Sequence, residues 1–595
     1  MSKFIKLSAG FMAAAMFVSC SNDVLTEEGV NTDGNKPVGD VAYMAVKISN
    51  VNDRHNAKSR TTDDDFAIGE ESEHKVKHAQ FFFFDKDGVK VLKAGYVYEP
   101  DNDDFTDHTS GNVESVTGKN VVVLENMNGN NYPEYMMTVL NAPNFTAEAT
   151  LAETAKKLVD WQGRRNEEGR FVMCTSSYFG DGDNHDNTNY YVTKITPNDF
   201  KNSFEEARNA TDPLEVYVER LAAKVAVKVS SEIKDAVTLK DGRVLYKLAQ
   251  SVAGEDNDDN NPSGSASTEL YVEVTGWGLN ATADKSHMAK MLDLNWKDNG
   301  VWAAWNEASK FRSYWGKSTA YGKSDFDGVL TYSKYKDLTS AVGGYEYCNE
   351  NTNTPENITT KKDDGTVLVN NAAVTHVVLK ARVCDKQGNG LDLISHRGVL
   401  FLSKDYKAYI LNRVKTLYGL NCYYYVNSTT DGNVETKHYA QVGVDDLKFI
   451  KDGVALGKVQ MVLADESKQM YAKKDDGTFE EISSEILVAN LKAVQGETPL
   501  VNYNGGASVY YIPVQHLVAH EVENAAKNDE GYYGVVRNHW YNISINSFSK
   551  VGHGVFDPEN GNEIIVPDEP EDPYYYLGAR INILSWRLVD QNVDL

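Results

Sequence analysis

The fourteen residues VYVERLAAKVAVKV, at positions 216–229, carry the pattern that decides the fold. Ala223, Val225, Val227 and Val229 alternate there with Lys224, Ala226 and Lys228. Alternation of apolar and polar residues with a period of two indicates a β-strand that has one face in a core and one face in solvent. The stretch therefore predicts a strand with its valines inward and its lysines outward.

The same pattern recurs along most of the chain, which predicts a fold dominated by strands. Similar runs lie at residues 41–51, 76–84, 135–140, 270–276, 375–383, 509–514 and 540–548. A single apolar stripe of Leu151, Leu158 and Trp161 predicts a helix over 147–161. We expect a mostly β protein of two tandem antiparallel β-sandwich domains, of transthyretin-like or Greek-key type, with one or two short helices. A polar connection at 276–290 places the boundary between them near Lys285.

The charge of the chain limits its partners. Its 595 residues carry 60 Lys and Arg against 86 Asp and Glu, a net charge of −26. No sustained basic run is present, so the sequence offers no surface for nucleic-acid phosphates. An anionic membrane surface would also repel the body of the protein. A hydrophobic fraction of 41% is enough for a packed core and excludes global disorder.

The first twenty residues, MSKFIKLSAGFMAAAMFVSC, have the features of an export signal. Two lysines precede an apolar stretch that is too short to span a bilayer as a stable helix. The segment ends in Phe-Val-Ser-Cys, which resembles the lipobox of bacterial lipoproteins. We therefore expect a signal peptide over 1–19 and lipidation of Cys20, with an ordinary secretory signal as the alternative. The precursor would then be anchored by lipid in the outer membrane.

The remaining cysteines do not indicate a metal site. Cys174, Cys348, Cys384 and Cys422 form no CxxC pair and no Cys/His cluster with zinc spacing. Export permits disulfides, but four cysteines allow three pairings, and the sequence does not choose among them. Free thiols are the interpretation that we favour.

The C-terminal region differs from the rest of the chain. Residues 557–576, DPENGNEIIVPDEPEDPYYY, are acidic and rich in proline, which favours an extended arm. Ile581 and Ile583 then alternate with polar residues, and Trp586 and Leu588 continue the pattern one residue out of phase, as a β-bulge would produce. A strand at the end of an arm is suited to pairing at a distance.

Motifs of catalysis are missing from the sequence. The two Gly-Lys-Ser sequences, which begin at Gly316 and Gly322, lack the earlier glycine of a phosphate loop. His516 and His520 lack the adjacent glutamate of the zinc-protease motif, so we expect the two histidines to lie on a surface helix or turn. Asp181, Asp183 and Asp186 lie in a polar loop without the bidentate glutamate of an EF-hand. We therefore predict no enzyme, no cofactor and no metal site.

Several segments together resemble the type V pilins, or fimbrillins, and among them the shaft subunits of the minor fimbrium. The segments are YMAVKI, TVLNAPNF, FVMCTSS, VERLAAKVAV, YEYCNENT, VVLKARV, VYYIPVQ, VVRNHWYNISI and RINILSWRLVDQNVDL, spread over nearly the whole chain in the family's order. The resemblance implies two β-sandwich domains and polymerisation at the cell surface. It also implies that an arginine-directed protease removes the N-terminal segment with the first strand, and that a strand from another subunit replaces it. Further copies of the chain, anchor and tip subunits, and host or bacterial surface ligands would be the partners.

The residues fit this implied maturation. Arg60 lies in NAKSRTTDDDFAIG, a polar stretch directly after the first strand, so that Thr61 would become the new N-terminus. Arg54 is a second candidate for the cleaved bond. The released first strand would carry Met44, Val46 and Ile48. The chain then divides into a propeptide at 20–60, sandwich domains at 61–285 and 286–556, and an arm with a donor strand at 557–595.

Two alternatives stay open at the level of sequence. The strand with Ile581, Ile583, Trp586 and Leu588 could be the last strand of its own C-terminal domain rather than a donor to a neighbour. The whole chain could be a monomeric surface lipoprotein that binds glycans through its many Tyr and Trp residues. A proline-rich arm with an apolar strand favours the fimbrial interpretation, because a glycan binder has no need of it.

Overall fold

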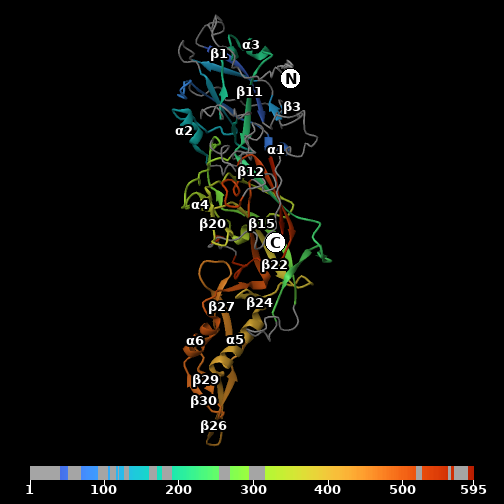
Figure 1. The fold of residues 1–595 in the computed structure, drawn as a ribbon, viewed down its shortest axis with the longest axis vertical. Helices are drawn as coiled ribbons and strands as arrows, with labels where there is room; N and C mark the ends of the chain where they lie inside the picture. The colour runs from blue at the N-terminus through green and yellow to red at the C-terminus, as the bar shows by residue number, and fades with distance from the viewer. Residues whose placement is uncertain are drawn as a thin grey trace, which may run out of the picture.

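The computed structural model describes residues 41–50, 69–74, 76–91, 105–106, 115–117, 120–125, 133–159, 170–176, 191–253, 268–293, 315–516, 526–560, 564–567 and 587–594. The molecule is elongated, and three tiers follow one another along its long axis (Figure 1). The upper tier holds the described residues between 41 and 220. The middle tier holds the described residues between 222 and 384 and between 507 and 594, and the lower tier holds 393–503.

The upper tier is one ten-stranded sheet, and alternate residues of its strands belong to two apolar cores. Its strand order is β2-β6-β8-β11-β1-β4-β3, with β5 and β10 also paired to β1 and β9 paired to β6. The elements are β1 (Val41–Asn50), α1 (Glu71–His74), β2 (Ala79–Phe84), β3 (Phe105–Thr106), β4 (Ser115–Thr117), β5 (Asn120–Glu125), β6 (Tyr135–Leu140), α2 (Leu151–Lys156), β7 (Leu158–Val159), β8 (Met173–Thr175), β9 (Thr193–Lys194), β10 (Phe200–Lys201), α3 (Phe204–Asn209) and β11 (Leu214–Arg220).

The middle tier is a β-sandwich. A four-stranded sheet of order β19-β12-β33-β35 faces a six-stranded sheet of order β13-β14-β15-β22-β32-β34 across a shared apolar core. The elements are β12 (Ala222–Val229), β13 (Val237–Thr238), β14 (Val244–Ser251), β15 (Glu269–Asn280), β16 (Thr282–Ala283), β17 (Ser286–His287), β18 (Leu330–Thr331), β19 (Tyr345–Asn349), α4 (Pro355–Ile358), β20 (Thr359–Lys361), β21 (Val367–Val369), β22 (His376–Cys384), β32 (Ala507–Pro513), β33 (His539–Ser547), β34 (His553–Gly554) and β35 (Arg587–Asp594).

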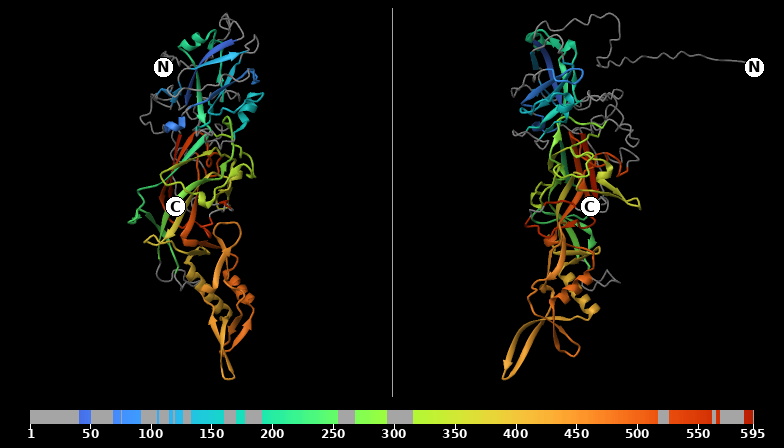
Figure 2. Two further views of the ribbon diagram at one scale, coloured as in Figure 1. Left: turned by 180° about the vertical axis from the view of Figure 1, so that it is seen from behind. Right: turned by 90° about the vertical axis from the view of Figure 1, so that its left-hand side faces the viewer.

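The lower tier is inserted between β22 and β32, which pair directly with each other in the middle tier. The elements are β23 (Leu393–His396), β24 (Val399–Leu402), α5 (Ser403–Tyr418), β25 (Cys422–Asp431), β26 (Val434–Gln441), β27 (Leu447–Lys451), β28 (Lys458–Leu463), β29 (Met470–Lys473), β30 (Phe479–Ile482), α6 (Ser484–Gln495) and β31 (Leu500–Tyr503). The chain leaves and returns at one point, where a Cβ atom on Gly390 would lie 2.1 Å from the Gly505 carbonyl oxygen. The hairpin of β25 and β26 forms the far end of the tier (Figures 1 and 2).

The mostly β, mainly antiparallel fold predicted from the sequence is confirmed. The run at 135–140 is β6, and the run at 41–51 is β1 to within one residue. The run at 216–229 is two strands, β11 and β12, which continue each other through Leu221. Among the described strands, three pairs are parallel, namely β1 with β11, β12 with β33, and β33 with β35.

Other predictions need correction. The helix expected over 147–161 spans only Leu151–Lys156, because Leu158 and Val159 pair as strand β7 with β17. The two longest helices of the described residues, α5 and α6, were not predicted, and neither was the lower tier. Lys224, predicted to face solvent, is 1% exposed. Strand pairing changes from the upper to the middle sheets at Leu221. We therefore propose Leu221, rather than the region near Lys285, as the domain boundary.

The four cysteines at 174, 348, 384 and 422 are free and buried, in agreement with the favoured interpretation. Burial raises the pKa of the Cys174 thiol to about 12 and that of Cys422 to about 11, so neither is a thiolate at neutral pH. Among the described helices, none is long and apolar enough to cross a membrane.

Candidate functional site

The first strand lies in the middle of the upper sheet. On one side β1 pairs antiparallel with β5, from Val41 opposite Glu125 to Val46 opposite Asn120, and then with β4. On the other side it pairs antiparallel with β10 and, from Val46 opposite Leu214 onward, parallel with β11. Because both edges of β1 are paired, its removal would leave two rows of unpaired backbone groups facing a gap.

The side chains of β1 that the structure describes are fully inside the tier. Met44 and Val46 are 0% exposed and Ala45 is 2% exposed, so the strand is buried on both faces. Met44 and Val46 belong to the core of the upper tier, which contains Phe81, Phe83, Val122, Leu124, Met136, Met173, Val216 and Val218 among others. Ile48 is opposite Val216 in the ladder, and its side chain lies outside the described residues. The place of β1 is therefore an apolar groove between β5 and β11 that needs a strand to fill it.

Helix α1 is the first described helix after β1, and it is fastened to the middle tier. Glu73 is 0% exposed, and its carboxylate Oε1 lies 2.8 Å from the ammonium of Lys224 on β12. The hydroxyl of Tyr347 on β19 donates to the same oxygen. Arg220 donates from Nε to the Glu73 carbonyl oxygen at 2.8 Å. These residues, Glu73 with Lys224, Arg220 and Tyr347, are called the α1 clamp below.

The α1 clamp is electrostatically satisfied although it has no access to water. Burial alone raises the pKa of Glu73, but the charge of Arg220 and the hydrogen bonds from Lys224 and Tyr347 outweigh it and lower that pKa below its usual value. The Lys224 ammonium also lies over two aromatic rings, 3.9 Å from the centre of Tyr345 and 4.0 Å from that of Trp540. The clamp therefore ties the chain after β1 to the body of the protein independently of β1.

A second buried ion pair lies within the middle tier, close to its junction with the upper tier. Arg537 is 0% exposed and is paired with Glu350, which is 1% exposed. The guanidinium also donates to the carbonyl oxygens of Met288 and His287, at 2.9 and 2.8 Å. The segment with Met288 is in turn bonded to the end of α2 through the Lys157 carbonyl oxygen. The upper and middle tiers are thus held together by the α1 clamp, by the hydrogen bond between Met288 and Lys157, and by the chain that runs from β11 through Leu221 into β12.

The sequence did not reveal these clusters. Lys224 follows the outward phase of its strand, and Glu73 lies in a polar stretch with no pattern. Their hydrogen bond spans 151 residues of chain, and the bond from Tyr347 to Glu73 spans 274. No local signal could have found the α1 clamp.

The C-terminal strand lies at the edge of the middle tier. Strand β35 pairs with β33 alone among the described strands, in parallel, from Arg587 opposite His539 to Asp594 opposite Ser547. Leu588 is within β35, whereas Ile581, Ile583 and Trp586 lie outside the described residues. In the single chain the strand is therefore paired within its own subunit, through one ladder only, as the intramolecular alternative expects.

Other predicted site residues fall in different places. Cys20, Arg54, Arg60 and Thr61 lie outside the described residues, as do Asp181, Asp183, Asp186 and His520. His516 is 0% exposed and lies 2.9 Å from the Tyr541 hydroxyl, so the expectation of a surface position is wrong for it. Among the described residues, no group of three or more His, Cys, Asp and Glu side chains could hold a metal ion.

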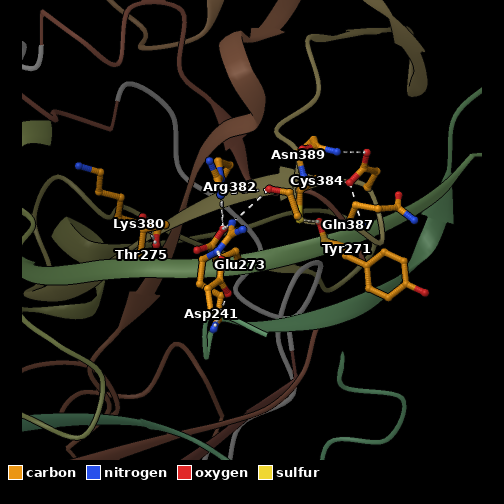
Figure 3. Close-up of polar contacts among 12 residues, drawn as sticks. Asp241, Tyr271, Glu273, Thr275, Lys380, Arg382, Cys384, Gln387 and Asn389 are labelled. Atoms are coloured by element: carbon orange, nitrogen blue, oxygen red, sulfur yellow. Dashed lines mark hydrogen bonds and ion pairs between the residues drawn. The ribbon is translucent and has the colours of Figure 1, made fainter. Parts of the chain in front are cut away.

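A cluster of charged side chains lies where the chain passes from β22 toward the lower tier, and it combines a carboxylate, two guanidiniums and a thiol (Figure 3). Glu273 accepts from Arg382 at 2.5 Å and from Arg243 at 3.2 Å, and both guanidiniums also donate to the Gly388 carbonyl oxygen. The Cys384 thiol beside it has its pKa raised to about 12, chiefly by burial. A carboxylate neutralised by two arginines and a protonated thiol provide neither a base nor a nucleophile. The cluster holds the point where the chain leaves β22 for the lower tier.

The structure therefore defines an elongated β-rich protein in which the first strand is buried at the centre of a sheet and the last strand lies at the edge of another. Residues 501–592, which run from β31 into β35, match the family "Major fimbrial subunit protein type IV, Fimbrillin, C-terminal". This region is similar to the C-terminal part of the fimbrillins, in agreement with the resemblance seen in the sequence, and the match supports a structural role in a fimbrium. No curated protein matches the sequence.

Several solved structures are similar to the chain at a low level. A fimbrilin from Porphyromonas gingivalis W83 has 12% identity and a TM-score of 0.26, over 93% of this chain and 97% of that one. The tip fimbrial protein Mfa3 from Porphyromonas gingivalis, with a C-terminal truncation, has 11% identity and a TM-score of 0.24, over 67% of this chain and 99% of that one. A fimbrial assembly protein from Parabacteroides distasonis has 11% identity and a TM-score of 0.26, over 57% and 81%. These scores are too low to carry an argument, so the assignment rests on the match of the C-terminal region.

Proposed function

We propose that this chain is the shaft subunit of a surface fimbrium. It is exported as a lipoprotein precursor, cleaved after Arg60, and polymerised by donor-strand exchange with further copies of itself. Anchor and tip subunits would complete the fimbrium. The observation that carries the proposal is the position of β1, which is paired on both edges and buried on both faces.

Cleavage between β1 and α1 would separate the N-terminal segment that carries β1 from the mature chain that begins before α1. Arg54 and Arg60 both lie between the end of β1 and Glu71, the first residue of α1. The α1 clamp lies after both bonds, so the mature chain keeps its attachment to β12 and β19 whichever arginine is used. The released segment would take the lipid anchor and β1 together, and the groove between β5 and β11 would open.

The C-terminal strand is suited to fill that groove. As an edge strand with one ladder, β35 can leave its own subunit at the cost of one row of hydrogen bonds, whereas the groove offers a row on each side. Burying Ile581, Ile583, Trp586 and Leu588 there would contribute roughly 1.5–3 kcal/mol each before the entropy of ordering the chain is subtracted. The exchange therefore has a net driving force once β1 is gone.

The decisive experiment is polymerisation of the purified precursor after treatment with trypsin or another arginine-cleaving protease. We expect filaments in electron micrographs of the wild-type chain. A chain lacking residues 577–595 should remain a folded monomer, because β1 still completes the upper sheet before cleavage. An unfolded truncation would support the intramolecular alternative, and a truncation that still forms filaments would refute strand donation.

The cleavage site is tested on the assembled material. N-terminal sequencing should begin at Thr61, and Arg60→Ala should prevent assembly. A start at His55 would move the site to Arg54. A mature chain that begins at Cys20 would refute maturation by removal of β1.

Lipidation is tested separately. Replacing Cys20 by Ala should abolish palmitate labelling and leave an unprocessed or periplasmic precursor. Normal labelling and surface display of the Cys20→Ala chain would contradict the assignment.

A further inference from the structure

The segment 564–567 is fastened to the middle tier just before the stretch that leads to β35. The backbone N–H of Ile565 donates to the Ser333 carbonyl oxygen at 2.9 Å. Its own carbonyl oxygen accepts from the Asn280 amide at 2.8 Å. Ile564 forms an antiparallel bridge with Lys334. Four residues of otherwise irregular chain are thus held by a backbone hydrogen bond, which belongs to the bridge, and by a hydrogen bond from a side chain.

Asn280 is the centre of this attachment. It ends β15, is 0% exposed, and its Oδ1 accepts from the Ser333 N–H at 2.7 Å. Its amide nitrogen also lies 3.2 Å from Nε2 of His376, which starts β22 opposite it. Since Nδ1 of His376 lies 2.9 Å from the Val374 carbonyl oxygen and donates to it, Nε2 is the acceptor for Asn280. One buried amide therefore joins two strands of the sandwich to the tail segment.

The side chains of the segment alternate sharply in burial. Ile565 is 0% exposed and packs in a core cluster with Tyr335, Leu338, Val378, Leu456, Ala507, Val509 and Val555. Its neighbours Ile564 and Val566 are 54% and 47% exposed, and Pro567 is buried. Ile565 is thus the isoleucine that anchors the segment 564–567 in the core of the middle tier.

We infer that Ile565 and Asn280 form the fixed end of the exchangeable arm. In the fimbrium, the chain up to Pro567 stays with its own subunit, and only the chain after it passes to a second copy. This inference rests on the proposed strand exchange and adds to it the residues that hold donor and recipient subunits together. Tension along the filament would pass from the donated strand into the sandwich at Ile565.

The chain after Pro567 is long enough for this role. Residues 568–586 separate Pro567 from the first residue of β35. These 19 residues could span up to roughly 65 Å when fully extended. The attachment at Ile565 therefore need not open for β35 to reach the groove of a neighbouring subunit.

Two engineered disulfides on either side of Pro567 test the inference. Lys334→Cys with Ile564→Cys would lock the attachment, since these residues face each other in an antiparallel bridge. Asn542→Cys with Asp590→Cys would lock β35 to β33, because Asn542 on β33 lies opposite Asp590 on β35. Both variants carry Cys20→Ala, and the other four natural thiols are buried, so they do not compete for oxidation in the folded precursor. Closure of each disulfide is verified by mass spectrometry before the protease is added.

The expected results differ for the two disulfides. The 334–564 lock should leave filament formation at the wild-type extent, and the 542–590 lock should abolish it until a reductant is added. If the 334–564 lock prevents assembly and reduction restores it, the attachment must open during exchange and the inference is wrong. If the 542–590 lock also permits filaments, β35 is not the donor, and the proposed function fails instead.

A matched pair of substitutions tests the attachment itself. Ile565→Ala should increase hydrogen exchange of the residue 565 amide at least tenfold in the monomer and lower the temperature at which filaments dissociate. Ile564→Ala removes the same atoms from an exposed position and should change neither. Equal behaviour of the two variants, or loss of protection at Ile565 in wild-type filaments, would overturn the inference.

Discussion

Neutralising one residue of the α1 clamp should destabilise the protein strongly. The substitution Glu73→Gln keeps the shape of the side chain but leaves the Lys224 ammonium, which is 1% exposed, without its counter-ion. Removal of one partner from a buried ion pair costs about 3–5 kcal/mol. The aromatic rings of Tyr345 and Trp540 still face the ammonium and offset part of this, so we expect a cost of about 3 kcal/mol.

Urea unfolding of the precursor at pH 7, followed by tryptophan fluorescence, measures this cost. The double variant Glu73→Gln with Lys224→Met removes both charges and should recover to within about 1 kcal/mol of wild type. Glu70→Gln is the matched control, because Glu70 is exposed and its carboxylate accepts from the Tyr345 hydroxyl at 2.7 Å. We expect a change of at most about 0.5 kcal/mol for it.

The clamp also predicts a dependence on pH. The pKa of Glu73 is lower in the folded chain than its usual value of 4.5, so the contribution is fully present above that value and is lost as the pH falls through the lowered pKa. The Glu73→Gln variant should lack this part of the acid sensitivity. A cost below about 1 kcal/mol, or a double variant no more stable than the single one, would refute the argument from burial.

Three further predictions follow from burial in other parts of the molecule. In a Cys20→Ala chain, a thiol reagent at pH 8 should label none of the four buried cysteines until urea is added, and then all four; fast labelling of the folded chain would contradict the structure. Val46→Ala on β1 should destabilise the precursor by about 1–3 kcal/mol and leave the stability of filaments unchanged. Val122→Ala on β5 should destabilise both the precursor and the filaments. If Val46→Ala weakened the filaments, β1 would have to remain in the assembled subunit. Replacing residues 427–438 of the β25–β26 hairpin by Asn-Gly should cost at most about 0.5 kcal/mol, since nearly all these side chains are exposed, and a loss above about 2 kcal/mol would indicate contacts that the structure does not show.

The positions of many elements follow from the sequence alone. Alternation of apolar and polar residues is a property of neighbouring residues, so the limits of β6 and β1 could be predicted to within a residue. Helix α5 also has a local signal in the sequence, because Tyr406, Ile410 and Val414 are spaced four apart and are all buried. The mostly β fold class and the pattern of the C-terminal strand can likewise be predicted from short stretches of sequence.

The partners of each strand were decided only by the tertiary structure. Nothing local distinguishes β1, at the centre of a sheet, from β35, at the edge of another, because ladders join residues far apart in the chain. The alternating pattern of its strand predicted that the Lys224 side chain would be exposed, yet the side chain is buried in an ion pair with Glu73, 151 residues away. Ile565 in the same way looks like any residue of a proline-rich tail until Asn280, 285 residues earlier, binds its carbonyl oxygen. Burial and pairing depend on the whole surface that surrounds a residue, and that surface exists only once distant segments have packed.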